Sequence, residues 1–431
     1  MSGPAATIAR VIRGEGIASA MRRTTERVTE AWHGATLRAR GTFARAGNCA
    51  ILNVSAAGVA TRLGGVQTQL ATRLREERTL RDVALLYQGV LELSAPFPHA
   101  HRISPFAPTR ALFSLTFERA LGEAMAMTAA RTVHLEGTDG VPIGSVLRLA
   151  ESGARVVISV HDFSLFCARP HLLEQPMERF CFYSHDLERC LRCLSQSWET
   201  PRDAQSERRD LARRLLTSAA GVIFPSRVLF DRHRDLFSLP EMKGAVVEPG
   251  APGPEVRLSS SGPRSAIAYA GSVQRHKGAH LMPEIIRRSA AEIDWHIFGG
   301  GDEDLLRAMR RLPNVTIHGY YRPGRLPSLL ARHRIGLVVL PSIVPESHGL
   351  ILSEARLAGI AATAFDLGAL AERIGQDGGG WLAPLESGAA GLATIVEQWH
   401  AGQLTTNVPA APSTPLAAAQ AHVDLYRQWG C

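Results

Sequence analysis

The sequence predicts an α/β protein made of two doubly wound domains with parallel sheets. Short apolar runs rich in β-branched residues alternate with helix-like segments, which is typical of parallel α/β folding. The alternation stops at residues 248–265, a segment rich in Pro, Gly and Ser, and then starts again. A chain of 431 residues is also longer than a single hydrophobic core ordinarily serves.

Composition narrows the class of protein. With 45% hydrophobic and 20% charged residues, the chain has the balance of a globular protein. It contains no run of about 18 apolar residues, so no transmembrane helix is expected. Arginines interrupt the N-terminus where a secretory signal would need an apolar core. We therefore expect a cytoplasmic protein, whose cysteines would be thiols or metal ligands and not disulfides.

Residues 1–47 are predicted to form a basic helical extension. They carry eight arginines against three glutamates, and apolar residues recur at helical spacing. This segment either packs on its own domain or rests as an amphipathic helix on an anionic membrane, which would place the protein at the inner face of the membrane. The net charge of +8 suits acidic partners. No basic patch is interleaved with aromatic residues, so nucleic acid is not expected as a partner.

The first predicted domain covers residues 48–247. Its candidate strands are "AILNVS" (50–55), "RVVISV" (155–160) and "GVIF" (221–224), and a helix is expected over "VQTQLATRLREE" (66–77). The almost wholly apolar "RVVISV" suits a central parallel strand that is covered on both faces.

The second predicted domain covers residues 266–404. Its candidate strands are "AIAYA" (266–270), "WHIF" (295–298), "VTIHG" (315–319), "IGLVVL" (335–340) and "AATAF" (361–365). A helix is expected to begin near Gly349. A last helical stretch, residues 415–431, is expected to pack back on the first domain.

Suggestive polar residues and glycines follow several of these strands. In open parallel sheets, ligands bind beyond the carboxyl ends of the strands. The residues at such positions are Gly64–Gly65, His161–Asp162, Lys277, Gly299–Gly301 and Glu346. Lys277 is a compact charge suited to phosphate, and the first amides of the helix near Gly349 could hold a pyrophosphate. "FGGGDED" is not G-x-G-x-x-G opening a helix, which disfavours a nicotinamide site.

The segment "PSIVPESHGLILSEARLAG", followed by "AATAFDLGALAERI", resembles the signature of retaining nucleotide-sugar glycosyltransferases of the GT-B group, family 4 (glycosyl transferases group 1). The E-x7-E spacing of Glu346 and Glu354 matches, as do "GSVQRHKGAH", "PNVTIHGYY", the Gly64–Gly65 loop and "HDFSLFC". The resemblance covers roughly residues 48–400. It implies two facing Rossmann-like domains with the active site in the cleft.

The resemblance also implies roles for individual residues. Glu346 would meet the hydroxyls of the donor sugar, and Glu354 would accept hydrogen bonds from the ribose. The diphosphate or sugar would be held by the backbone at His348, Gly349 and Leu350. The other implied contacts are Lys277 at the diphosphate, Gly64 and Gly65 at a close backbone approach, and His161 at the sugar.

One position departs from the family pattern. Many relatives have arginine five residues before the lysine, where this chain has Ser272. Either Arg275 compensates, or the diphosphate depends more on Lys277 and the helix amides. Because these groups can stabilise a leaving diphosphate, and because no Asp-x-Asp pair lies near the proposed site, no cofactor or metal is expected to be required for catalysis.

Four cysteines fall within 27 residues: Cys167, Cys181, Cys190 and Cys193. Four thiols with a C-x2-C pair could form a structural zinc site, although the spacing is not that of a standard zinc finger. The alternative is a set of separate reduced thiols in the core.

The sequence leads us to expect a glycosyltransferase that moves a sugar from a nucleotide-diphosphate sugar to a glycan or lipid-linked acceptor, in cell-envelope or exopolysaccharide biosynthesis. Two alternatives stay open. One is a nucleotide-sugar epimerase or a phosphorylase on the same architecture. The other is a non-catalytic subunit that binds nucleotide sugar, to which Ser272 lends some weight.

Overall fold

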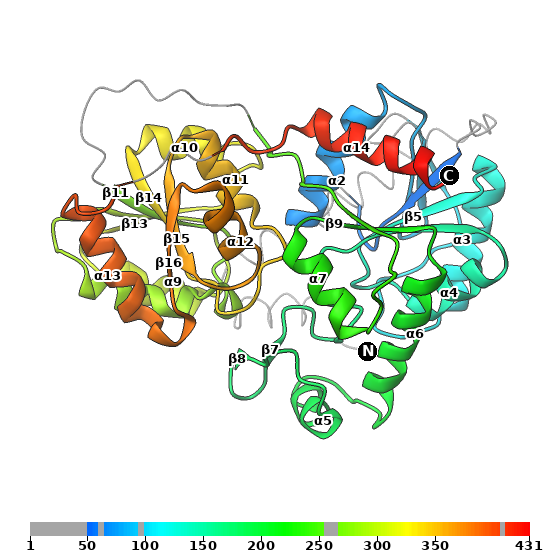
Figure 1. Cartoon of the computed structure of the whole chain (residues 1–431), viewed down its shortest axis with the longest axis horizontal. Coiled ribbons are helices and arrows are strands. Elements are labelled where there is room, and N and C mark those ends of the chain that lie inside the picture. The colour runs from blue at the N-terminus through cyan, green and yellow to red at the C-terminus, as the bar shows by residue number, and fades with distance from the viewer. Residues whose placement is uncertain (1–49, 59–63, 94–98, 254–265, 406–409) are drawn as a thin grey trace, which may run out of the picture. The chain divides into compact units, whose positions relative to one another are not determined.

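The computed structural model describes residues 50–58, 64–93, 99–253, 266–405 and 410–431. The predicted extension at 1–47 and most of the predicted linker lie outside the described residues. The described chain forms two compact units (Figure 1). We call them the N-terminal domain (residues 50–250, 346–348 and 413–431) and the C-terminal domain (residues 251–345 and 349–412).

The N-terminal domain is built on an eight-stranded sheet with the order β10-β9-β6-β5-β1-β2-β3-β4. Its strands are β1 (Ile51–Val54), β2 (Ala84–Tyr87), β3 (Val90–Leu93), β4 (His99–Arg102), β5 (Thr132–Glu136), β6 (Arg155–Ser159), β9 (Gly221–Phe224) and β10 (Gly244–Val246). Neighbours are parallel except at one edge, where β2–β3 and β3–β4 are antiparallel. This antiparallel edge is not among the features that the sequence predicts. Gln88 and Gly89, with φ of 44° and 81°, form a tight turn that lets β2 and β3 pair without a crossover helix.

Helices and one small hairpin complete this domain. The helices are α2 (Gly65–Glu77), α3 (Leu115–Thr128), α4 (Ile143–Glu151), α5 (Leu187–Ser195), α6 (Ala204–Ser218), α7 (Arg227–Leu236) and α14 (Pro415–Gln428), and the hairpin pairs β7 (Leu173–Glu174) with β8 (Arg179–Phe180).

The C-terminal helix α14 belongs to the N-terminal domain, where it packs beside α2 (Figure 1). The Tyr426 hydroxyl lies 2.6 Å from His134 Nδ1 on β5. Trp429 covers Gly221 so closely that a Cβ there would come within 2.3 Å of the indole. The end of the chain is thus part of the core of a domain whose other elements precede residue 251.

The C-terminal domain has a parallel six-stranded sheet with the order β13-β12-β11-β14-β15-β16. Its strands are β11 (Ala266–Ala270), β12 (Trp295–Phe298), β13 (Val315–Gly319), β14 (Ile335–Leu340), β15 (Ala361–Phe365) and β16 (Gly380–Ala383). Its helices are α8 (Met282–Arg288), α9 (Glu303–Arg310), α10 (Leu326–Arg332), α11 (Leu350–Leu357), α12 (Gly368–Asp377) and α13 (Gly388–His400), with short 3-10 turns η1 (Arg275–Lys277), η2 (Ala279–Leu281) and η3 (Leu385–Ser387).

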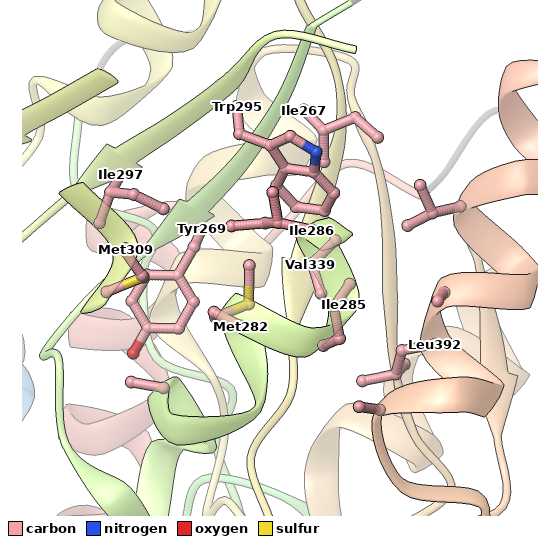
Figure 2. Close-up of a cluster of buried hydrophobic side chains, with 14 of the residues drawn as sticks. Ile267, Tyr269, Met282, Ile285, Ile286, Trp295, Ile297, Met309, Val339 and Leu392 are labelled. Carbon is pink, nitrogen blue, oxygen red and sulfur yellow. The ribbon is translucent and has the colours of Figure 1, made fainter. Parts of the chain in front are cut away.

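The inner strands β11, β14 and β15 are buried on both faces, which explains their continuous apolar sequences. Along β11, Ile267 and Tyr269 face a cluster with Met282, Trp295 and residues of α13 (Figure 2). The alternate alanines of β11 face a second cluster, to which α10 and α11 contribute. Large side chains on one face and small ones on the other allow the helices of the second face to lie close to the sheet.

The eight strands that the sequence predicted are confirmed. They correspond to β1, β6, β9 and β11 to β15, with bounds that agree to within a residue. The predicted helix near Gly349 is α11, which begins at Leu350 with Gly349 as its N-cap.

Candidate functional site

The order in which strands are added to the C-terminal sheet reverses between β11 and β14. From β11 the chain proceeds outward to β12 and β13, then returns to place β14 on the other side of β11. In open α/β sheets such a switch point marks the ligand site, because the loops after the two strands separate there. The two loops are residues 271–278, with Lys277, and 341–349, with Glu346.

Hydrogen bonds and a close backbone approach join these two loops. The Ile343 amide and the Ser342 hydroxyl both donate to the carbonyl of His276, each at 3.2 Å. Gly278, with φ of 71°, lies so close to Pro341 that a Cβ would be 1.7 Å from the Pro341 carbonyl oxygen. The structure therefore places the turn η1, which contains Arg275 and Lys277, beside the start of the loop that leads to Glu346.

Ser272 lies in the loop that directly follows β11. Its carbonyl accepts a hydrogen bond from the Tyr269 hydroxyl at 2.6 Å, which fixes the backbone of the loop. In the other loop, Glu346 and His348 lie in the connection between β14 and α11, and Leu350 is the first residue of α11.

The start of α11 is held by a residue that sequence reasoning missed. Gly349 has φ of 80°, and a Cβ there would lie 2.5 Å from Leu370 Cδ2. Buried Arg373 of α12 donates to the Gly349 carbonyl at 3.3 Å and to Ser353 Oγ at 3.0 Å. The sequence gives only a weak signal for this residue, because an arginine in an amphipathic helix ordinarily points to solvent.

Glu354 is buried in the second turn of α11, with 4% exposure. Its Oε1 atom has no hydrogen-bond partner among the described residues. Burial raises the pKa of Glu354 to about 8, against the opposing effect of a hydrogen bond from the Gly324 backbone. A buried carboxyl oxygen without a hydrogen-bond partner is costly, so this position suits a ligand that donates hydrogen bonds.

The glycines of "FGGGDED" have a packing explanation. A Cβ on Gly299 would lie 1.8 Å from the carbonyl oxygen of Gly271, and one on Gly301 would lie 2.3 Å from that of Val273. Val273 and Gly301 form an isolated parallel bridge. The run thus lets the loops after β11 and β12 touch through their backbones.

In the N-terminal domain, His161 follows β6 and lines a cavity of about 40 Å³ with Arg73, Glu136 and His422. Burial, with a smaller effect of Arg73, lowers the pKa of His161 to about 4. The imidazole is therefore neutral near pH 7. Gly64 is the N-cap of α2 and Gly65 its first residue.

Arg73 of α2 ties that helix to the sheet. It forms an ion pair with Glu136 of β5 and another with Glu77, at 3.0 Å, within α2. Glu136 is also 3.0 Å from His134, which contacts Tyr426 of α14. Sequence reasoning missed this buried network, because its members are far apart in the chain and match no motif.

All four cysteines predicted as a group line one small cavity, which lies between the β7–β8 hairpin and α5. They are free thiols in the structure. The possible ligand set that the sequence suggested is therefore brought together by the fold.

A second group of metal-ligating side chains was not foreseen. His296 of β12, His318 of β13 and His333 after α10 place one ring nitrogen each within 4.8 Å of the others. His296 Nδ1 and His318 Nε2 are 2.8 Å apart. Three imidazoles so arranged could hold a transition-metal ion. Pairing of neighbouring strands creates the group, so spacing in the sequence gives no signal for it.

Comparison with known proteins agrees with this geometry. Residues 264–401, nearly the whole C-terminal domain, match the family model described as Glycosyl transferases group 1. Comparison of the whole chain with curated protein sequences returns no significant match.

Solved structures align with residues of both domains. Sucrose-phosphate synthase from Thermosynechococcus elongatus aligns with a TM-score of 0.62 at 16% identity, over 88% of this chain and 98% of that one. The catalytic domain of starch synthase IV from Arabidopsis thaliana, bound to ADP and acarbose, aligns with a TM-score of 0.58 at 13% identity, over 89% and 99%. Anabaena HepE in complex with UDP-glucose aligns with a TM-score of 0.52 at 17% identity, over 88% and 98%.

These similarities establish the fold, which is the GT-B fold of two Rossmann-like domains, as the sequence predicted. The C-terminal domain carries the sequence features of group 1 glycosyltransferases. Among the described residues, no helix is long and apolar enough to cross a membrane.

Proposed function

We propose that this protein is a retaining, family 4 glycosyltransferase that moves a sugar from a nucleotide-diphosphate sugar to a glycan or lipid-linked acceptor. The observation that carries the proposal is the buried Glu354 carboxylate, whose unpaired Oε1 atom suits ribose hydroxyls, in a domain that matches the group 1 family model. Three similar structures contain UDP, UDP-glucose or ADP, which supports a nucleotide-linked donor.

The proposed chemistry depends on stabilising the departing diphosphate. Lys277 supplies a positive charge, and the first amides of α11 supply hydrogen-bond donors at the positive end of a helix dipole. Arg275 lies in the same turn as Lys277 and can take the place of the arginine that Ser272 replaces. These groups need no metal ion, so we propose metal-independent transfer. Glu346 and His161 are assigned to the hydroxyls of the donor sugar.

The positive net charge of the chain supports the proposed class of acceptor. Its net charge of +8 suits an acidic or membrane-bound acceptor, and residues 1–47 would bring the enzyme to an anionic membrane surface. We propose a role in cell-envelope or exopolysaccharide biosynthesis.

The test is to incubate the purified full-length chain with a panel of UDP-, ADP- and GDP-sugars, with and without lipid-linked and glycan acceptors, and to measure free nucleoside diphosphate. Acceptor-dependent release that persists in a chelator supports the proposal, and NMR of the product's anomeric proton tests retention. An epimerised donor would identify an epimerase instead. Donor binding without turnover would identify a non-catalytic subunit.

A further inference from the structure

We propose that Cys167, Cys181, Cys190 and Cys193 bind one zinc ion, which fixes the segment between β6 and α6. The four residues come from three places in the chain. Cys167 follows β6, Cys181 directly follows β8, and Cys190 and Cys193 lie one helical turn apart on α5. All four line the same cavity. Its volume of about 20 Å³ admits one atom-sized occupant, which favours a single ion over an iron–sulfur cluster.

The hydrogen bonds around the sulfur atoms distinguish metal ligands from ordinary core thiols. The Arg169 amide lies 3.4 Å from Cys167 Sγ, and the Gln175 amide lies 3.2 Å from Cys193 Sγ. Arg209 approaches Cys190 Sγ to 3.5 Å. Cys181 is approached by the amides of Tyr183 and Ser184.

Every one of the four sulfur atoms therefore accepts from an N–H group. A protonated thiol in a core behaves as a small apolar group and has little use for such donors. N–H donors stabilise the charged form of an acid, and the thiolate is the form that binds zinc. Cys190 Sγ also donates to the Ser184 carbonyl at 3.6 Å, a bond that requires the protonated thiol and that zinc would replace when the thiol loses its proton. The N–H donors at the four sulfur atoms suit ligating thiolates.

The charge around the cavity is also suitable. Four thiolates and one Zn²⁺ carry a net charge of about −2. Arg209 and Arg169 bring positive charge to the cavity, and Arg209 contacts a sulfur directly. Glu174 is occupied by Arg189 through two contacts of 2.6 Å, so its carboxylate is engaged elsewhere. The surroundings thus offset the negative charge of a zinc–thiolate centre.

The segment has little else to hold its shape. Between β6 and α6 its regular elements are two-residue strands β7 and β8 and the nine-residue helix α5. Leu172, Glu178, Phe182 and Tyr183 all have positive φ, which costs conformational energy in residues with a side chain. A metal cross-link between the hairpin and α5 would stabilise such a segment, because the free energy of binding adds to that of folding.

Binding should draw the sulfur atoms closer together. A tetrahedral zinc site with Zn–S distances of about 2.3 Å places its sulfur atoms about 3.8 Å apart. Among the described residues, which include this whole segment, no three of the four sulfur atoms lie within 4.8 Å of one another. Zinc binding therefore requires α5 and the hairpin to move closer to Cys167.

The first experiment measures zinc by mass spectrometry in the full-length chain, purified without chelator. About one zinc per chain should survive dialysis, and Cys190→Ser and Cys193→Ser should each lose it. Cys431→Ser is the matched control, because this thiol lies outside the cavity. His318→Ala controls for the three-histidine group and should retain the tightly bound zinc.

The second experiment uses the wild-type chain, so its result does not depend on whether a variant folds. Cobalt exchanged into the wild-type chain should give the intense near-ultraviolet sulfur-to-cobalt absorption and the visible bands of a tetrahedral thiolate site. The zinc-loaded chain should also resist proteolysis between residues 161 and 203 better than the chelator-treated chain. Absence of metal with freely reactive thiols, zinc lost only in His318→Ala, or bound iron with visible absorption near 400 nm would each overturn the proposal. None of these outcomes depends on glycosyl transfer.

Discussion

Gly278 and Pro341 are in backbone contact across the switch point of the C-terminal sheet, where a Cβ on Gly278 would lie 1.7 Å from the Pro341 carbonyl oxygen. The contact joins the turn that contains Lys277 to the loop that leads to Glu346. Because the obstruction is backbone and not a flexible side chain, an added methyl group would have to separate the two loops.

Gly278→Ala should therefore weaken donor binding and destabilise the domain by about 1–3 kcal/mol beyond the cost of its positive φ. The matched control is Gly402→Ala. Gly402 has φ of 68°, close to the 71° of Gly278, and nothing within 4 Å of its added Cβ. Chemical denaturation and donor titration of both variants check the prediction. Equal effects of the two substitutions would show that backbone strain alone matters.

Glu346 and Glu354 should respond differently to substitution. Glu354 lies inside α11, whereas Glu346 lies in the loop before it. Glu354→Ala should weaken donor binding by about 1–3 kcal/mol, through loss of hydrogen bonds to a charged group, and so raise KM. Glu346→Gln should mainly lower kcat, because its proposed contacts lie where charge develops in the transition state. Steady-state kinetics separates the two effects, and small, equal changes in both parameters would show that the donor site is misplaced.

The predictability of the C-terminal domain had a physical basis. Its strands "AIAYA", "IGLVVL" and "AATAF" are buried on both faces, so each appears as an uninterrupted apolar run. The alternation with helices then predicts that the strands are parallel, and the E-x7-E spacing falls across a strand-to-helix loop. The positions of Glu346 and Glu354 could therefore be read from local sequence.

The parts that escaped prediction depend on distant contacts. Strand β3 contains Glu92, and a charged residue argues against a buried strand. In the fold, Glu92 accepts a hydrogen bond from the Tyr87 hydroxyl of β2 at 2.5 Å. Arg373 resembles a surface residue until α12 packs on the start of α11. The three histidines come together only because β12 and β13 are neighbours in the sheet. No local pattern carries such information.

The three-histidine group should make stability depend on pH. Burial and the neighbouring imidazoles lower the pKa of His296 to about 4, and burial first, then His333, lowers the pKa of His318. These groups stay neutral in the folded chain while the unfolded chain binds protons below its usual value of 6.5. Their contribution to stability is thus present above about pH 6.5 and is lost as the pH falls toward 4.

His296→Gln should flatten this dependence, whereas His99→Gln, at an exposed position at the start of β4, should leave it unchanged. Denaturant unfolding measured at several pH values between about 4.5 and 7.5 provides the slopes. Identical slopes in the wild type and His296→Gln would contradict the assignment. Buried His134 and His233 also have lowered pKa values and contribute to the slope of the wild type. The test therefore depends on the difference in slope between the variants and the wild type.

Residues 1–47 should bind membranes if they form the proposed amphipathic contact. The full-length chain should associate with vesicles that contain anionic lipid, with an affinity that falls as the salt concentration rises. Deletion of residues 1–47 should abolish vesicle binding and leave nucleoside diphosphate release intact. Flotation of both proteins with neutral and anionic vesicles checks the prediction. Loss of folding on deletion would instead indicate a helix that packs on its own domain.

Donor binding should release a proton from Glu354. Burial raises the pKa of this carboxyl group to about 8 from an ordinary value of 4.5, so the folded chain without donor holds a proton there near pH 7. Between these two values the folded chain binds more protons than the unfolded chain, and its stability falls as the pH rises. Ribose hydroxyls that donate to the carboxylate favour the charged form and lower the pKa.

The affinity for the nucleotide-sugar donor should consequently rise between about pH 6.5 and pH 8, the range in which the unliganded carboxyl group gives up its proton. Calorimetry in buffers of different ionisation enthalpy measures the protons directly, because the observed heat then varies with the buffer. The wild type should release up to about one proton per donor near pH 7, and Glu354→Gln, which keeps the shape but cannot ionise, should release none from this site. Heats that do not vary with the buffer in the wild type, or that vary equally in Glu354→Gln, would show that the ribose does not bind to this carboxylate.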